Sequence, residues 1–415
     1  MVIGNGYKDK ELSATEVESI VTEAFQAVKV DGKRILFIIP DSTRTAPVGL
    51  MFRLFHKIIG TRVKRMDYLI ALGTHQPMSP EKINVHLGIT ERDWQKYPNI
   101  KVFNHLWDDP ASFRKVGTIS AKEIADISGG LLKEDIPVEI NKLIYDYDMF
   151  FILGPTFHHE VVGFSGGNKY LFPGICGPRF LNLFHWLGAL ITNVSINGVI
   201  DTPVRAAIDR AASFIGMTYH NFDMVVQHGK LKGLFFGEVR EAWRKAAELS
   251  NELHVVYKPR RFSKILGIAP HMYDDLWTGG KVMYKLEPVI EDGGEIIIYA
   301  PHITEVSYTH GKTIDRIGYH VRDYFLKQMD TFKDIPLGIM AHSTHVRGTG
   351  GFDGVKETPR VKVTLATGIP RERCELINLG YADPAQVNIE SFRNREAEGI
   401  LLVDHAGEML YRVQS

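Results

Sequence analysis

The sequence predicts an α/β fold with two domains, and three observations support this prediction. Short apolar runs end abruptly in polar residues, amphipathic stretches lie between many of them, and the alternation restarts late in the chain. Continuous apolar runs are typical of strands buried on both faces, as in parallel sheets, and alternating strands and helices indicate the α/β class. The chain of 415 residues is also longer than one ordinary domain core.

Six apolar runs are predicted to be strands, and each is followed by a polar segment that carries His, Arg or Asp. In chain order they are Arg34–Pro40, Tyr68–Leu72, Met149–Leu153, Ile265–Ile268, Glu295–Tyr299 and Leu337–Met340. Ligands of open α/β sheets bind beyond the carboxyl ends of the strands. The polar run ends therefore predict one site, or a site shared between two sheets.

Three segments have the apolar spacing of amphipathic helices: Val48–Ile59, Phe180–Ile191 and Glu238–Leu253. A basic, proline-containing segment, Tyr257–Arg261, follows the last of them and marks the expected domain boundary. We expect domains at residues 1–260 and 261–399, with residues 400–415 able to return to the first domain.

The composition excludes several classes of protein. Lys+Arg and Asp+Glu are both 49, so the chain has no basic footprint for nucleic acid. Its apolar runs are far shorter than the roughly 20 residues that span a bilayer, and its N-terminus has no apolar signal core. Two cysteines, Cys176 and Cys374, do not indicate a disulfide framework or a Cys-rich metal site. We expect a cytoplasmic protein without nucleic-acid or membrane partners.

The segment Pro155–Gly177 has the highest density of candidate residues and contains a Gly-x-Ser-x-Gly pattern around Ser165. One interpretation is a hydrolase nucleophile elbow, although the strand before it is weak and no oxyanion loop of the HGGG type lies upstream. A second is a tight turn in which Ser165 caps the following helix. A third is that Gly166 and Gly167 let the backbone approach a phosphate or cofactor beside Lys169.

The 17 histidines include four that the pattern singles out. His158 and His159 are adjacent, so on an extended segment they point in opposite directions and only one is expected to be functional. His75 follows a buried strand and is a catalytic candidate. His185 lies in a predicted helix among aromatic residues, where a partly buried structural histidine is the commoner outcome.

Other candidates lie at further strand ends. Asp41 or Ser42 could simply cap a helix, whereas the Arg44 guanidinium is suited to a carboxylate or phosphate. In the second half, Lys281 is either a solvated charge or a second cation for an acidic substrate. His342 and His345 form an H-x-x-H pattern, but no third metal ligand has a recognisable spacing.

Together these motifs resemble the nickel-pincer lactate racemase family, most strongly in the first domain. The long H-x-x-x-G-F-S-G-G-x-K element is the specific one, whereas the shorter motifs alone are not. The matching elements are D-x-T-R-x-x-P (Asp41, Thr43, Arg44, Pro47), G-T-H (Gly73–His75), H-x-x-x-G-F-S-G-G-x-K (His159–Lys169), F-P-G-I (Phe172–Ile175) and a helical His185.

The resemblance implies a two-domain α/β enzyme with its site in an interdomain cleft. It also implies a covalent cofactor, a pyridinium-3-thioamide-5-thiocarboxylic acid mononucleotide that holds nickel, and hence cofactor-biosynthesis proteins as partners. Lys169 corresponds to the attachment residue and His185 to the protein ligand of nickel. The wider implied cofactor site comprises Asp41, Thr43, Ser165, Gly166 and Gly167.

The residues fit the chemistry of inverting C2 in a 2-hydroxy acid. Hydride removal yields a stable 2-keto acid, and a base must take the hydroxyl proton as the hydride leaves. Inversion of both enantiomers suits two bases, which we assign to His75 and His159. The expected substrate-binding set is Arg44, Lys281, Trp277, Thr278, His342 and His345.

The substrate is expected to be a polar or sugar acid rather than lactate. The second domain has many polar groups at the ends of its apolar runs. Where these groups face the substrate, hydroxyls can pair with them, whereas a methyl group leaves them unpaired, and a buried polar group without a partner costs about 1–3 kcal/mol. Two alternatives from other classes remain open at this point: a Ser165 hydrolase, and a noncatalytic protein that binds nucleotides or anions.

Overall fold

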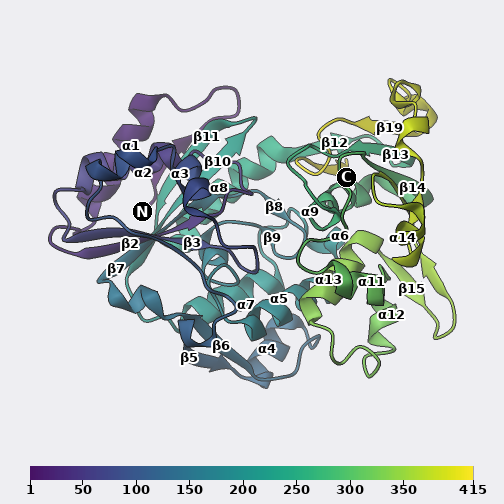
Figure 1. The fold of residues 1–415 in the computed structure, drawn as a ribbon, viewed down its shortest axis with the longest axis horizontal. Coiled ribbons are helices and arrows are strands. Elements are labelled where there is room, and N and C mark those ends of the chain that lie inside the picture. Colours follow the sequence, from purple (N-terminus) through teal and green to yellow (C-terminus); the bar gives the residue numbers. More distant parts are fainter. Residues whose placement is uncertain (415) are drawn as a thin grey trace. The chain divides into compact units, whose positions relative to one another are not determined.

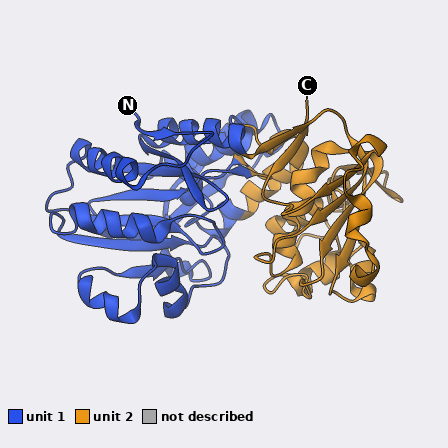
Figure 2. Ribbon diagram, turned by 90° about the horizontal axis from the view of Figure 1, so that it is seen from above, with its two compact units in different colours: residues 1–158, 164–181, 200–253 blue, residues 159–163, 182–199, 254–415 orange. Residues whose placement is uncertain are grey.

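The computed structural model describes residues 1–414 and divides into two compact units, each assembled from several chain segments (Figure 2). Unit 1 comprises residues 1–158, 164–181 and 200–253, and unit 2 comprises 159–163, 182–199 and 254–415. The main division thus falls close to the expected boundary. Two early segments nevertheless belong to unit 2, which the sequence did not indicate.

Residues 400–414 lie in unit 2, whereas the sequence had left a return to the first domain open. The reason is strand pairing. Strand β19 (Ile400–Val403) pairs with β13 (Phe262–Ile268), and β20 (Leu410–Val413) pairs with β12 (Val255–Lys258).

Unit 1 is built on a seven-stranded sheet in the order β1-β11-β10-β7-β2-β3-β4 (Figure 1). The five strands from β10 to β4 run parallel, while β11 pairs antiparallel with both β10 and β1. The strands are β1 Ile3–Gly6, β2 Arg34–Pro40, β3 Arg65–Ala71, β4 Val102–Asn104, β7 Met149–Pro155, β10 Tyr219–Gln227 and β11 Lys230–Gly237.

The central strands are buried on both faces, as their continuous apolar runs predicted. Alternate side chains of β2, β3 and β7 share one core with the apolar faces of α1 and α2. Helix α8 packs its alanines and leucines against Val225 and Phe235. The remaining elements assigned mainly to unit 1 are α1 Ala14–Ala27, α2 Val48–Ile59, α3 Pro80–Leu87, β5 Phe113–Ile119, α4 Ala121–Ser128, β6 Ile136–Asn141, α7 Pro203–Ala212 and α8 Val239–His254.

The strand order of unit 1 reverses between β2 and β7. The chain proceeds from β2 outward to β3 and β4, and then returns to the other side of β2 to form β7 and β10. Such a switch point opens a crevice at the carboxyl ends of the two central strands, where ligands of α/β sheets bind. Asp41 follows β2, and Thr156 follows β7. The topology thus favours a site around these two residues.

Unit 2 contains a five-stranded parallel sheet in the order β18-β17-β14-β13-β19, so the predicted α/β class is confirmed in both units. Two segments cross between units: α5 Pro178–Ile191, and the pair β8 His158–His159 with β9 Gly163–Phe164. The other elements of unit 2 are α6 Asn193–Ile196, α9 Leu276–Gly279, α10 Lys281–Leu286, β14 Ile290–Ala300, α11 Gly311–Ile317, α12 Arg322–Leu326, α13 Leu337–Arg347, β15 Gly350–Phe352, β16 Glu357–Pro359, β17 Lys362–Thr367, α14 Arg371–Leu376 and β18 Gly380–Tyr381.

One predicted strand is wrong. Leu337–Met340 begins helix α13, which runs on to Arg347 and follows Pro336. Every residue from Ile339 to Val346 is buried, polar ones included, so this stretch has no solvent-exposed face and its sequence lacks the usual amphipathic period. Between residues 1 and 414, no helix is long and apolar enough to cross a membrane.

Candidate active site

Asp41 and His75 form a close pair at the carboxyl ends of two neighbouring parallel strands. Pro40 is the register partner of Ala71, so the loops after β2 and β3 meet at one edge. The Nδ1 atom of His75 lies 2.5 Å from Oδ2 of Asp41. The side chain of Asp41 is buried, whereas that of His75 is 36% exposed. With Nδ1–H donating to the carboxylate, the neutral ring carries its lone pair on Nε2 and can accept a proton there.

The environment of Asp41 favours its charged form. Burial by itself would raise the pKa of this carboxyl, but the hydrogen bond and charge of His75, the nearby Arg44 and the Thr43 hydroxyl together lower it. Thr43 contributes both its hydroxyl and its backbone N–H to Oδ1 of Asp41. The interpretation of Asp41 or Ser42 as a helix cap is wrong, because α2 begins after Pro47 without a side-chain cap.

Arg44 lies in the same loop, with its guanidinium 5.7 Å from the centre of the Phe157 ring. It is half-buried, and within residues 1–414 it forms no ion pair with a carboxylate. A guanidinium that is not neutralised and lies at a strand end can bind an anionic substrate in a fork of two hydrogen bonds.

Ser165 does not have the geometry of a nucleophile. Ser165 is buried. Its hydroxyl donates to the Pro155 carbonyl at 3.0 Å and accepts a hydrogen bond from the Phe157 N–H at 3.0 Å. These bonds tie the turn to the end of β7. The capping interpretation is also wrong, since the short helical turn Gly167–Tyr170 begins after Gly166 without a side-chain cap.

Gly166 and Gly167 are required by contacts inside the protein. Both have positive φ, and a Cβ on Gly166 would lie 2.1 Å from the Thr156 hydroxyl and 2.7 Å from Asp223. The N–H of Gly167 donates to Oδ1 of Asp223 at 3.2 Å. This N–H is therefore already bonded within the protein, while an approach of the Gly166–Gly167 backbone to a phosphate or cofactor stays a prediction.

Two buried residues that the sequence did not single out, Arg205 and Trp243, donate hydrogen bonds to the backbone of the turn around Ser165. Arg205 of α7 donates to the carbonyls of Phe164 at 2.5 Å and of Gly166 at 3.3 Å. Trp243 of α8 donates to the carbonyl of Ser165 at 2.7 Å and stacks with Arg205 at 4.1 Å. A buried guanidinium facing backbone carbonyls has no sequence signature, because its partners lie about 40 positions away.

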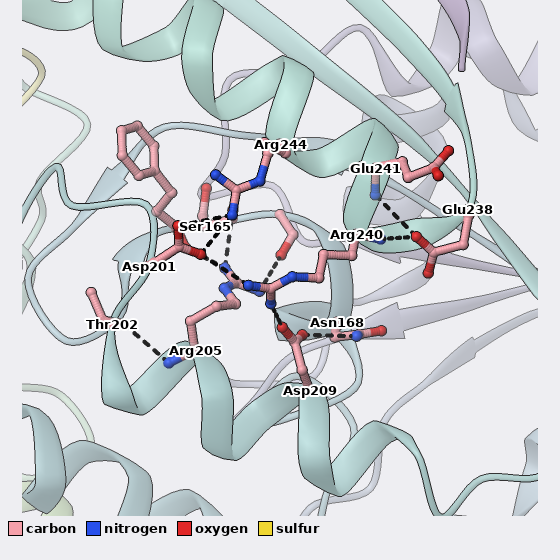
Figure 3. Close-up of polar contacts among 12 residues, drawn as sticks. Ser165, Asn168, Asp201, Thr202, Arg205, Asp209, Glu238, Arg240, Glu241 and Arg244 are labelled. Atoms are coloured by element: carbon pink, nitrogen blue, oxygen red, sulfur yellow. Dashed lines mark hydrogen bonds and ion pairs between the residues drawn. The ribbon is translucent and has the colours of Figure 1, made fainter. Parts of the chain in front are cut away.

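Asn168 is held from two sides, as Figure 3 shows in part. Its side-chain amide donates to Asp209 at 3.0 Å, and its carbonyl accepts from the Tyr219 hydroxyl at 3.1 Å. Asp209 is in turn paired with Arg240 at the surface. The neighbouring Lys169 is half-buried. The turn that carries this lysine is thus fixed by α7, α8 and the sheet together.

The two adjacent histidines fall in different environments. His158 is 1% exposed and packs against Phe164, as expected for the structural member of the pair. His159 belongs to unit 2, where its Nδ1 accepts the N–H of Val161 at 3.2 Å and lies 3.5 Å from the Glu160 carboxylate. In its neutral form His159 therefore carries its proton on Nε2, the opposite tautomer to His75.

His185 also belongs to unit 2 and is half-buried, and its ring packs edge-to-face with that of Phe184, with ring centres 4.9 Å apart. Its neighbours on α5, Trp186 and Leu187, are buried. Among residues 1–414, no three His, Cys, Asp or Glu side chains come together in a way that could hold a metal ion.

Trp277 and His342 stack face to face in unit 2, with ring centres 3.7 Å apart. His342 is fixed further by the hydroxyls of Tyr284 at 2.8 Å and Tyr319 at 3.4 Å. Burial and the neighbouring histidines hold the pKa of His342 well below its usual range, so the ring is neutral. The His310 ring also contacts Trp277 in a tilted arrangement, with ring centres 4.6 Å apart.

The other candidates of the second domain are two predicted substrate-binding residues and several polar residues at the ends of apolar runs. Thr278 donates to Asp275 at 2.9 Å as part of the helix start, and the Lys281 ammonium lies 4.7 Å from the Tyr273 ring. Three of the polar groups that suggested a polar substrate are held by the scaffold instead. Glu305 pairs with Arg373, Ser343 bonds to Gly318 and His320, and Arg347 donates to Asn378.

Comparison with known proteins agrees with the motifs. Residues 7–196 match the family model of the lactate racemase N-terminal domain. The lactate racemase of Thermoanaerobacterium thermosaccharolyticum is 25% identical over 285 residues, which cover 68% of this chain and 63% of that enzyme. The match thus spans less than two thirds of the length of this relative.

Two solved structures share the fold. A crystal structure of a protein from Thermotoga maritima has 32% identity and a TM-score of 0.89, covering 98% of this chain and 100% of its own. The apoprotein of the Thermoanaerobacterium thermosaccharolyticum lactate racemase has 19% identity and a TM-score of 0.73, with full coverage of both chains. On the motifs and the matched model, residues 7–196 form a lactate racemase N-terminal domain, and over 285 residues the chain is similar to a lactate racemase.

Proposed function

We propose that this protein is a racemase or epimerase that inverts C2 of a 2-hydroxy acid by reversible hydride transfer. The observation that carries this proposal is the Asp41–His75 pair beside Arg44 at the switch point of the sheet. A base held by a buried carboxylate, next to a guanidinium without an ion-pair partner, suits a hydroxyl group adjacent to a carboxylate.

Each residue has a role in this reaction. Arg44 and Lys281 bind the substrate carboxylate, and His75 takes the hydroxyl proton at Nε2 as the C2–H bond breaks. His159 serves as the second acid–base group, so that each enantiomer has its own partner. In its charged form His159 donates the Nε2 proton to the keto oxygen of the intermediate, and the proton that stays on Nδ1 faces the Glu160 carboxylate, 3.5 Å away.

The residues fit a covalent nickel-pincer nucleotide, which would supply the hydride acceptor when bound. Lys169 is half-buried on a turn fixed on both sides, as an attachment residue requires. His185 offers a single imidazole outside any cluster of three metal-binding side chains within residues 1–414, which suits a metal whose other ligands come from the cofactor. The assignments of Lys169 and His185 rest on the family resemblance together with these environments.

Intact-mass and nickel measurements test the proposal. Protein produced together with a cofactor-making system should carry an adduct and nickel, and Lys169→Ala should lose both as well as activity. Lys122→Ala is the matched control, because Lys122 is 87% exposed and pairs only with Asp126 at the surface. An adduct that survives in Lys169→Ala would disprove the attachment site, and nickel retained in His185→Ala would disprove the metal ligand.

Isotope retention tests the reaction type. Hydride transfer should return a C2 deuterium to the inverted product in ordinary water, whereas proton abstraction would exchange it with solvent. Ser165→Ala distinguishes the hydrolase alternative, which the buried, bonded hydroxyl already disfavours. Loss of racemisation in Ser165→Ala with the fold and adduct intact would contradict our assignment of this residue to the scaffold.

The substrate we propose is a polar or sugar acid. The support is a polar group of unit 2 that the described part of the scaffold does not use, the buried Nε2 atom of His345. Turnover of lactate, malate, phenyllactate and gluconate-type acids should be compared. Faster inversion of lactate or phenyllactate than of every polyhydroxy acid would disprove this part of the proposal.

A further inference from the structure

Unit 2 contains a cavity of about 170 Å³ between the end of α5 and the end of α13. At about 30 Å³ for each molecule of liquid water, it has room for roughly five or six waters. Its polar lining includes Asn193, Glu287, Arg322, His345 and Thr349. None of these residues belongs to a motif that the sequence singled out, except His345.

The cavity continues the face of α5 that carries His185. Ala189, which lines the cavity, follows His185 by four positions on α5, and Thr192 lies just after the helix ends at Ile191. Residues four positions apart lie on one side of a helix. The cavity is therefore aligned along the same helix face as the proposed nickel ligand.

His345 supplies a polar atom that the protein itself does not satisfy. The residue is 4% exposed, and its Nε2 is buried without a hydrogen-bond partner. Burial lowers the pKa of His345 to about 4, so the ring is neutral near pH 7 and this nitrogen can pair with a hydroxyl. Leaving a buried polar atom unpaired is costly, which indicates that a ligand or water occupies the position beside it.

The Glu287 carboxylate determines whether a charged ligand group can bind in the cavity. It is 1% exposed, and its oxygens accept from the Thr349 N–H at 2.8 Å and from the Asn193 amide at 3.2 Å. The one cationic side chain that lines the cavity, Arg322, donates to the Leu190 carbonyl at 2.8 Å and to Asp323 at 3.0 Å. Arg360 lies 3.7 Å from the Glu287 carboxylate and compensates this one charge, so a second carboxylate in the cavity would lack a cationic partner of its own.

We propose that this cavity binds a short, uncharged, hydroxylated carbon chain, the tail of a polyhydroxy acid. Hydroxyls both donate and accept, so they can donate to the Glu287 carboxylate and pair with Nε2 of His345, as an alkyl chain cannot. The part of the inference that concerns a substrate tail rests on the proposed function, but binding of the polyol itself does not. The cavity selects polyhydroxy acids against both lactate-like and dicarboxylic acids.

Binding is tested on the full-length apoprotein with erythritol as the probe and 1,4-butanediol as its matched chain without inner hydroxyls. Ring ¹⁵N and ¹H signals of the histidines report on the cavity through His345. Erythritol should shift the His345 signals and bind about tenfold more tightly than the diol. No shift at His345, or equal binding of the two compounds, would overturn the cavity assignment.

Selectivity is tested on the loaded enzyme with His345→Phe, which removes Nε2 and retains a ring. The ratio of kcat/KM for a gluconate-type acid to that for lactate should fall about tenfold, and His345→Gln should restore part of it. Thr331→Val is the control, because Thr331 is an exposed residue of the same unit. An unchanged ratio in His345→Phe would overturn the substrate-tail inference. If wild-type protein binds erythritol but never racemises an acid, the proposed function fails while the cavity assignment stands.

Discussion

Histidines in the two units have contrasting environments. His75 of unit 1 is half-exposed and bonded to a buried carboxylate, whereas His342 and His345 of unit 2 are buried among Trp277, Tyr284 and each other. The first arrangement prepares a ring to move a proton, and the second keeps rings neutral and fixed. The surroundings of a histidine therefore determine its role. A nearby carboxylate prepares the ring for proton transfer, whereas burial among aromatic side chains keeps the ring neutral for substrate recognition.

The largest expected effect comes from removing the proposed base, His75. His75→Ala should lower kcat by roughly 10²–10⁴-fold, because general base catalysis contributes that much. Adduct mass, nickel content and fold should not change. Asp41→Asn should lower kcat less, since the ring remains but loses its orienting carboxylate. Full activity in His75→Ala would show that His75 is not the base.

The next effect concerns the support beneath the lysine-bearing turn. Arg205→Leu should lower the free energy of unfolding by about 4 kcal/mol, because two buried carbonyls lose their donors. Arg244→Ala, which breaks a surface ion pair with Asp201, should change it by at most about 1 kcal/mol. Figure 3 shows both arginines and the Asp201 carboxylate. Urea unfolding measures the loss of stability in each variant. Equal losses in the two variants would contradict the supporting role of Arg205.

The buried histidine of unit 2 predicts a pH dependence of stability. The folded pKa of His345, about 4, lies below its ordinary value of 6.5, so the unfolded chain binds more protons between these values. Stability is therefore lost as pH falls from 6.5 towards 4, by up to roughly 3 kcal/mol from this group. Urea unfolding at pH 7 and pH 4.5 should show a smaller loss in His345→Phe than in wild type.

His105 of unit 1 gives a matched check on that explanation. Burial also lowers its pKa to about 4, and its ring bonds to Asn141 rather than to a carboxylate. His105→Phe should therefore reduce the loss of stability at low pH to a similar degree. An unaltered pH dependence in both variants would mean that burial does not control these rings.

The smallest expected effect concerns the Thr43 hydroxyl, which donates to the Asp41 carboxylate of unit 1. Thr43→Val removes one hydroxyl donor to Asp41 while His75 remains in place. We expect a loss of about 1 kcal/mol, seen as roughly a fivefold lower kcat/KM, because one hydrogen bond to a charged group is removed. A loss as large as that in His75→Ala would assign Thr43 a direct role at the substrate.

The sequence alone determined the class of fold, the strands that bear the site and the family. Arg34–Pro40 and Val48–Ile59 are predicted to the residue, since a fully buried strand and an amphipathic helix each leave a distinct apolar period. The turn around Ser165 was recognisable because positive φ and close packing require glycine at defined positions.

Tertiary structure decided the chemistry of individual side chains. The Asp41–His75 bond joins residues 34 positions apart, and the Arg205 bonds to the turn join residues about 40 apart, so no local pattern encodes them. It also decided that Leu337–Met340 is helical and that 182–199 belongs to unit 2. A helix buried on all sides has no amphipathic period, and which unit a segment joins depends on contacts that form only on folding.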